Sequence, residues 1–346
     1  MLMSALGSGV SALQAFTKGM NILGDNTANV NTVGFKSSTV TYSSAFGDVL
    51  NRSVPTSSGQ TTGSNSVTNQ IGGGVQLSAI SKDFKLGSIE KTGKWSDLAV
   101  NNDKGFFQVK DSINNTLYAT RAGNFRVDNN GFVVTQDGYR LQGLQYSADY
   151  SEPKYGVTID SNGKLTYTRI SLSGTSTTSI GDIKAKIDWT IEQGGKGGTL
   201  SLSAEVQAAI ASGSISNAQV IGSMHGINLL AFGPQGDFNI GLSDGKSCKP
   251  FQVLLMQFKD NNALIHEGKG LYDGFSAAGA DIFDKTHSLP GTNGLGTIQG
   301  SSLEGSNVDL TEQFATIIST QRSFQAASRI ITSSDEFLQE VVNLKR

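Results

Sequence analysis

Apolar residues recur at helical spacing at both ends of the chain. Near the N-terminus the steps alternate four and three, through Leu6, Val10, Leu13, Thr17 and Met20. Near the C-terminus the same alternation runs through Leu310, Phe314, Ile317, Gln321, Phe324, Ser328, Ile331, Asp335, Leu338 and Val342. Such a heptad stripe predicts an amphipathic helix at each end. With a rise of about 1.5 Å per residue, the second helix would be roughly 50 Å long.

Polar residues mark where these helices begin and end. The segment Asn26-Thr-Ala-Asn29 and Gly34 interrupt the first stripe. Asn307 or Asp309 could cap the second helix. Glu312 would then lie in its first turn, where a carboxylate interacts favourably with the helix dipole.

A helix of this length cannot cover its own apolar stripe, so we expect the two terminal helices to pack together as a coiled coil. Ordinary helix packing is the alternative, and Gln321, Ser328 and Asp335 weaken the seam for an isolated molecule. Such a marginal seam suits helices that become ordered when many copies stack. The predicted self-assembly residues are Leu6, Val10, Leu13, Met20, Leu310, Phe314, Ile317, Phe324, Ile331, Leu338 and Val342.

Between the helices the apolar period becomes two, which is typical of β structure. Residues 31–73 are rich in Ser, Thr, Gly and Asn and are expected to form an extended linker. We predict short strands at 75–80, 106–109, 117–120, 125–127 and 132–134. Asn130-Gly131 predicts a hairpin with a type I′ turn, in which both central residues need positive φ.

A second group of strands is predicted within residues 146–249, at 157–159, 165–167 and 187–189, with a short helix at 203–211 and a Gly-rich tip at 194–198. The apolar run 251–258 should return to the first group. The expected fold class is α+β and multidomain, with long terminal helices forming a coiled coil and two mainly β domains inserted between them. The expected domains are helical (1–30 plus 305–346), middle β (74–145 plus 250–304) and outer variable β (146–249).

Composition and charge narrow the possible functions. The chain has 346 residues, 42 glycines, 16% charged residues and a net charge of −2. This balance argues against binding of nucleic acid, which requires a basic surface. A single cysteine excludes an internal disulfide. The N-terminal segment lacks the basic start and unbroken apolar run of a cleaved signal peptide, and we predict no membrane insertion.

No pattern indicates an enzyme, a metal site or a cofactor. The three histidines, His225, His266 and His287, are far apart in sequence. Gly7–Ala12 matches a dinucleotide fingerprint by letters but follows no strand. Asp128–Gly131 resembles part of a calcium loop, yet Phe132 stands where a ligand is needed. We therefore expect no catalytic, cofactor-binding or metal-binding residues.

Several longer motifs resemble those of the bacterial flagellar rod and hook axial proteins. At the ends of the chain they are Leu6–Leu13, Asn26–Phe35, Ser302–Leu310, Gln321-Arg322 and Val342–Lys345. In the first β region they are Phe84–Gly93, Asp97–Val100, Gly105–Phe107, Tyr118–Phe125 and Gly138–Gly143. The resemblance covers residues 1–145 and 250–346, and its end is similar to the hook protein in particular.

The resemblance implies a structural subunit of the flagellar hook, an extracellular, flexible tube that carries motor torque from rod to filament. The terminal helices would line its channel, and residues 146–249 would face outward. The subunit would leave the cell unfolded through the flagellar type III export apparatus, without a cleaved signal peptide. Expected partners are further copies of itself, the distal rod protein, the hook cap protein and the hook–filament junction protein.

Two alternatives stay open. One is a distal rod subunit of the same family, although rod proteins are shorter and largely lack the insert of about a hundred residues. The other is a surface adhesin with helical tails.

Overall fold

The computed structural model describes residues 2–51, 69–146, 154–159, 165–170, 178–185, 190–191, 199–202, 227–242, 247–279 and 289–344. The chain divides into two compact units. Unit 1 comprises 1–31, 36–83 and 308–346, and unit 2 comprises 32–35 and 84–307. The predicted strand at 187–189, the helix at 203–211 and the tip at 194–198 lie outside the described residues.

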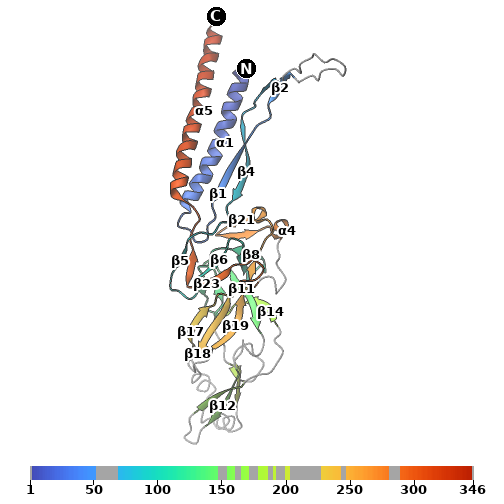
Figure 1. The fold of residues 1–346 in the computed structure, drawn as a ribbon, viewed down its shortest axis with the longest axis vertical. Helices are drawn as coiled ribbons and strands as arrows, with labels where there is room; N and C mark the ends of the chain where they lie inside the picture. Colours follow the sequence, from blue (N-terminus) through green and yellow to red (C-terminus); the bar gives the residue numbers. More distant parts are fainter. Residues whose placement is uncertain are drawn as a thin grey trace, which may run out of the picture. The chain divides into compact units, whose positions relative to one another are not determined.

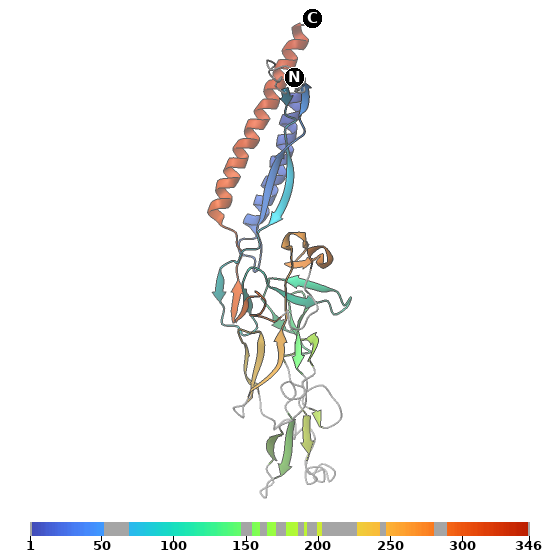
Figure 2. The ribbon, with the colours of Figure 1, turned by 45° about the vertical axis from the view of Figure 1, so that its right-hand side comes forward.

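Unit 1 is built on two long antiparallel helices, α1 (Leu2–Ala28) and α5 (Leu310–Leu344), which lie side by side with both chain ends at the same end of the pair (Figures 1 and 2). Both terminal helices were predicted from the heptad stripes. Asp309 is the N-cap of α5, because its Oδ1 accepts the N–H of Thr311 at 2.8 Å and that of Glu312 at 3.4 Å. Supercoiling of the pair stays a prediction.

A β arm lies against α1 in the same unit (Figure 1). It pairs β1 (Ser38–Ser44) with β4 (Val75–Lys82), and β2 (Asp48–Asn51) with β3 (Asn69–Ile71), all antiparallel. Tyr42 of β1 packs edge-on against Phe16 with ring centroids 5.8 Å apart. Its hydroxyl lies where a Cβ at position 19 would be, so any residue larger than glycine there would have to displace the Tyr42 side chain. Much of the described part of the expected linker 31–73, residues 31–51 and 69–73, is therefore paired β structure.

Unit 2 contains a 12-stranded sheet. Its strands in spatial order are β17 (Ile227–Phe232), β18 (Asp237–Leu242), β19 (Ser247–Val253), β11 (Arg140–Tyr146), β7 (Phe106–Lys110), β8 (Leu117–Thr120), β22 (Leu271–Asp273) and β21 (Ile265–Gly268). Four strands attach beside this path: β9 (Arg126–Val127), β10 (Val133–Val134), β14 (Thr178–Asp182) and β20 (Leu255–Met256).

Smaller sheets complete unit 2. The N- and C-terminal parts of the unit pair as β6 (Leu98–Asn101) with β23 (Thr297–Gly300) and as β5 (Ile89–Lys91) with β24 (Ser302–Glu304). A separate four-stranded sheet has the order β13 (Leu165–Ile170), β12 (Lys154–Ile159), β16 (Thr199–Leu202) and β15 (Thr190–Ile191). Two short helical turns are η1 (Asn261–Ala263) and α4 (Phe275–Ala278).

The predicted middle region is confirmed as β structure. Strands of unit 2 lie at or within two residues of the runs predicted at 106–109, 117–120, 125–127 and 132–134, whereas the strand predicted at 75–80 is β4 of unit 1. Strands β19 and β20 return to pair with β11 and β7. Strands β14, β17 and β18, from the expected outer domain 146–249, also join the large sheet. The boundary between middle and outer β domains stays a prediction.

The type I′ turn predicted at Asn130-Gly131 is wrong, although the hairpin is present. Gly131 has φ of 84°, whereas Asn130 is not among the described residues with positive φ. The N–H of Gly131 donates to the carbonyl of Asp128 at 3.0 Å, and the Asp128 Oδ1 accepts the N–H of Phe132 at 2.7 Å. The longer loop needs only one left-handed residue, which glycine supplies.

Unit 2 has two described apolar clusters. The larger lies across the sheet and includes Leu98, Phe107, Val109, Phe238 and Val253, all fully buried. The smaller is aromatic and surrounds Phe106, which lies edge-on to Phe258 and Tyr272. This aromatic cluster also packs against the charged site described next.

Candidate assembly surface and buried charge cluster

The first candidate site is the surface of the helix pair in unit 1. The two helices approach closely where Gly9 of α1 meets Ile331 of α5; a Cβ on Gly9 would lie 3.0 Å from Ile331 Cγ1. Ala327 and Ser334 of α5 are buried, and Ile317 and Phe324 are half-buried. These positions follow one helical stripe, which is the face of α5 turned toward the rest of unit 1.

The predicted assembly residues divide into two groups. The half-buried group contributes to the packing of unit 1 and consists of Leu6, Leu13, Met20, Ile317, Phe324 and Ile331. The exposed group consists of Val10, Leu310, Phe314, Leu338 and Val342. Whether either group contacts a neighbouring copy stays a prediction.

Sequence reasoning missed further exposed apolar residues on α5. Ile318 is 52% exposed and Phe337 is 55% exposed, and Ile330, Val341 and Leu344 are exposed as well. These residues lie off the four-three stripe, so the heptad pattern did not select them. A helix that keeps large apolar side chains in solvent on more than one side is typical of an interaction surface.

A buried asparagine joins α1 to its neighbours in unit 1. Asn26 has no exposed surface. Its Nδ2 donates to the Ser38 carbonyl at 2.8 Å and to Gln313 Oε1 at 3.2 Å, and its Oδ1 accepts the Ser38 N–H at 2.8 Å. One side chain therefore links α1, the start of β1 and the first turns of α5, which fixes their register.

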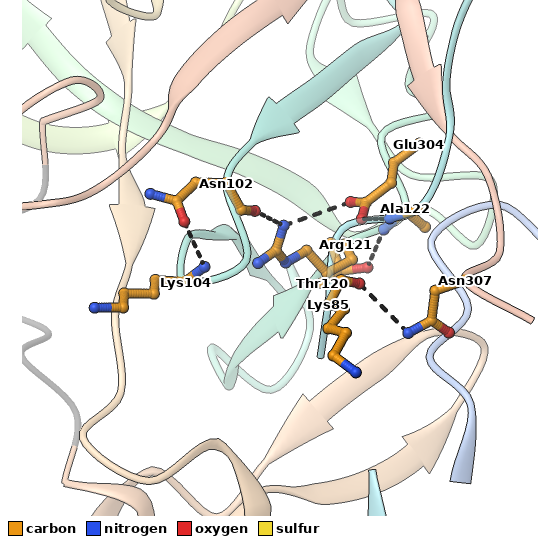
Figure 3. Close-up of polar contacts among 9 residues, drawn as sticks. Lys85, Asn102, Lys104, Thr120, Arg121, Ala122, Glu304 and Asn307 are labelled. Carbon is orange, nitrogen blue, oxygen red and sulfur yellow. Dashed lines mark hydrogen bonds and ion pairs between the residues drawn. The ribbon is translucent and has the colours of Figure 1, made fainter. Parts of the chain in front are cut away.

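The second candidate site is a buried ion pair in unit 2, shown in Figure 3. Arg121 follows β8, and Glu304 ends β24. Arg121 Nη1 lies 3.5 Å from Glu304 Oε2 and donates to the Asn102 carbonyl at 2.6 Å. Neither charged side chain has any exposed surface. A buried ion pair loses its contact with water, and this cost is offset only when further hydrogen bonds reach the charged groups.

Glu304 supplies those further contacts with both its side chain and its backbone. Its Oε1 accepts the N–H of Gly87 at 3.1 Å. Its carbonyl accepts the N–H of Gly34 at 2.8 Å. A side chain at position 34 would overlap the backbone of Arg121, with a Cβ 2.6 Å from the Arg121 carbonyl carbon, and Gly34 also has φ of 67°. Glycine is needed there on both counts.

The aromatic cluster sets the electrostatics of this site. The Arg121 guanidinium carbon lies 4.8 Å from the centre of the Phe106 ring. Burial lowers the pKa of Arg121, while Glu304 opposes that change. Burial raises the pKa of the Tyr272 phenol. Arg121 Nε and Nη2 are buried without a hydrogen-bond partner in the described structure. The face of the Phe106 ring, which attracts a cation electrostatically, therefore contributes to stabilising the buried guanidinium.

Sequence reasoning quoted Arg121 and Glu304 within motifs but assigned neither a role. No spacing rule could pair them, because 183 positions separate the two residues. The available signal was that Arg121 is the one charged residue of the motif Tyr118–Phe125, while Ser302–Leu310 has two, Glu304 and the helix cap Asp309.

The described residues hold no group of three or more His, Cys, Asp or Glu side chains that could bind a metal ion. None of the described helices is long and apolar enough to span a membrane.

The chain pairs its two terminal helices and leaves large apolar side chains of α5 exposed, as in a structural subunit rather than in a chain built around a metal site, and comparisons with known proteins identify its family. Three family models match: "Flagella basal body rod protein" at residues 6–36, "Flagellar hook protein FlgE/F/G D1 domain" at 100–178 and "Flagellar basal body rod FlgEFG protein C-terminal" at 299–344. Each model falls on a region that carries the motifs quoted above.

Relatives match along the whole chain. The flagellar basal-body rod protein FlgG of Bacillus subtilis is 30% identical, with 100% of both chains covered. The flagellar hook protein FlgE of Borreliella burgdorferi is 27% identical, covering 99% of this chain and 100% of that protein. The Escherichia coli hook protein FlgE is 23% identical with the same coverage. The chain belongs to the flagellar hook and basal-body rod protein family, whose members are structural components of the flagellum.

Proposed function

We propose that this chain is the structural subunit of a flagellar hook, which polymerises into a flexible tube and transmits torque from rod to filament. The observation that carries the proposal is the C-terminal part of the chain, because the motifs Ser302–Leu310, Gln321-Arg322 and Val342–Lys345 are similar to those of the hook protein in particular. The stretch between the D1 model, which ends at residue 178, and the C-terminal model, which begins at 299, contributes β17 and β18 to the large sheet. This stretch does not separate hook from rod, because a rod protein of Bacillus subtilis aligns with all of it.

A distal rod subunit is the second candidate, and a specific observation favours it. The Bacillus subtilis relative that bears the rod name aligns over 348 positions, close to the 346 residues of this chain. The two hook relatives align over 459 and 431 positions, so they carry insertions that this chain lacks. A hook is expected to form a curved tube and a rod a straight one, so the shape of the polymer separates the two candidates.

The helix pair is the proposed polymerisation element. Phe314 is 52% exposed and Val342 is 63% exposed, and each would lose this exposure against α1 or α5 of neighbouring copies. Full burial of an exposed apolar side chain of this size is worth about 1.5–3 kcal/mol, so burying the remaining half of each should stabilise an assembly by about 1–2 kcal/mol. Repeated over many subunits, a head-to-tail contact that does not close on itself builds a helical polymer.

The proposal includes location and partners. The subunit would act outside the cell, after passage through the flagellar type III export apparatus. It would contact the distal rod protein at one end of the tube and the hook–filament junction protein at the other. Growth would take place beneath the hook cap protein.

Electron microscopy separates hook from rod. Purified full-length protein is polymerised and imaged, and basal bodies from a strain lacking the gene are imaged beside those of the parent. Curved tubes, with basal bodies that retain a complete rod, are expected for a hook subunit. Straight polymers, with basal bodies that end before the distal rod, would overturn the hook assignment in favour of the rod.

A deletion separates the axial role from an adhesin. Removing residues 310–346 deletes α5, so polymerisation and swimming should both be lost. A matched control is Glu340→Ala, at an exposed polar position of α5 outside the quoted motifs, which should still polymerise. If the deletion variant still swam and lost only binding to a surface, the axial role would be excluded.

A further inference from the structure

The chain passes between its two units after residues 31, 35, 83 and 307. Within unit 2, the segments next to these points meet at Glu304. Gly34 donates its N–H to the Glu304 carbonyl at 2.8 Å, and Gly87 donates its N–H to Glu304 Oε1 at 3.1 Å. Segments from three distant parts of the sequence thus share one acidic residue.

Asn307 completes the connection between these segments. Its N–H donates to the carbonyl of Phe35 at 3.4 Å. Its Nδ2 donates to the carbonyl of Lys85, also at 3.4 Å (Figure 3). Gly305 donates its N–H to the Ser88 carbonyl at 2.7 Å. Segment 302–307 is therefore bonded to both segment 32–35 and segment 84–88, and we call these three the crossing segments.

Arg121 connects the crossing segments to the large sheet. Its guanidinium lies between Glu304 and the Asn102 carbonyl, at the end of β8. The preceding residue, Thr120, is in β8 and donates its hydroxyl to the Gly270 carbonyl at 2.8 Å. The carboxylate of Glu304 thus pairs with a residue that directly follows β8, a strand of the 12-stranded sheet.

We propose that Arg121 and Glu304 are positioning residues that clasp the crossing segments into one bundle anchored to the large sheet. A force carried along any one crossing segment is then shared by all three and by the sheet. This mechanical role rests on the proposed function as a torque-transmitting subunit. An apolar contact could fill the same volume, but it would not set the direction of the Gly87 N–H, because hydrophobic contact is non-directional whereas a hydrogen bond to a carboxylate is directional.

Amide hydrogen exchange in the full-length protein tests the clasp with three double variants. In the apolar double variant, Arg121→Met with Glu304→Leu replaces the pair by apolar groups and removes the acceptor for Gly87. In the amide double variant, Arg121→Met with Glu304→Gln is equally uncharged but keeps an acceptor oxygen. Arg140→Met with Asp182→Leu is the control, because that ion pair, at 2.8 Å, bridges β11 and β14 away from the crossing segments.

In the apolar double variant we expect the Gly87 amide to exchange at least about tenfold faster, the scale of a lost hydrogen bond to a charged group. The Gly34 amide keeps its acceptor, the backbone carbonyl of Glu304, and should exchange faster because the crossing segments are held together less firmly. Amides of β7 should keep their protection. The amide double variant should recover most of the protection at Gly87, and the control pair should leave both glycines unchanged. Unchanged exchange at Gly34 and Gly87 in the apolar double variant would overturn the clasp, as would faster exchange spread over all of unit 2.

The mechanical consequence is measured on polymers. The apolar double variant should polymerise like the wild type and swim normally in dilute medium, but it should lose speed in viscous medium. Swimming equal to that of the wild type at every viscosity would overturn the mechanical role. Failure of the wild-type protein to polymerise would instead refute the proposed function, while the exchange experiment would still decide whether the clasp exists.

Discussion

Gly123 is the position in unit 2 where a single added methyl group should do most damage. It is buried beside β6, and its carbonyl accepts the N–H of Leu98 at 3.0 Å. A Cβ at this position would overlap the Leu98 carbonyl oxygen and lie 3.3 Å from Phe107 Cε2. A carbon and a carbonyl oxygen need about 3.3 Å, so Gly123→Ala must move backbone on one side or the other.

The cost follows from these contacts. Overpacking of a rigid core costs up to about 3 kcal/mol. Separation of the two backbones also breaks the hydrogen bond from Leu98 to Gly123, worth about 1 kcal/mol. The free energy of unfolding of unit 2 should therefore fall by about 4 kcal/mol. Gly138→Ala is the control, since Gly138 has φ of 93° but no atom within 4 Å of its Cβ position. Strain in the left-handed region alone costs about 1 kcal/mol.

Denaturant unfolding followed by tryptophan fluorescence measures both variants. Trp95 stacks on Phe238 in the core of unit 2, with ring centroids 5.8 Å apart. A Trp189→Phe background makes Trp95 the sole fluorescent tryptophan. The reasoning fails if Gly123→Ala unfolds at the same denaturant concentration as Gly138→Ala, because the overlap of the added methyl group with the Leu98 carbonyl would then have no measurable cost.

Three further predictions test both units. Gly24 lies inside α1 with no atom within 4 Å of its Cβ position, so Gly24→Ala should stabilise α1 by about 0.5–1 kcal/mol; unchanged or faster amide exchange in α1 would contradict this. Phe314→Asp should reduce the polymer recovered by centrifugation without changing the circular dichroism of the monomer, and wild-type yield would remove Phe314 from the interface. Burial raises the pKa of Tyr272 above the ordinary 10.0. The unfolded state therefore loses this proton first, and the stability of unit 2, intact below pH 10.0, should fall as the pH rises above it. Tyr272→Phe should weaken that fall in alkaline denaturant midpoints, and an equal fall in both proteins would exclude Tyr272 as its source.

The amino-acid sequence by itself determined the elements whose signal is local. A four-three spacing at each end was enough for α1 and α5, and a period of two was enough for strands such as β7 and β8. The N-cap shows the limit of local information. Asn307 and Asp309 were equal candidates by residue type, and only the structure shows that Asp309 caps α5 while Asn307 bonds to Phe35 and Lys85.

Tertiary structure alone decided which side chains meet across long separations. The stripe of α5 does not reveal that Ile317 packs within unit 1 while Phe314 remains exposed, because both are apolar positions of one heptad pattern. Arg121 and Glu304 are ordinary charges when read locally. They become a buried pair because β5 pairs with β24 and β6 with β23, which brings residues from the two ends of unit 2 together. Local periodicity fixes backbone conformation, whereas contact between distant charges depends on how the strands are ordered, and no short stretch of sequence contains that order.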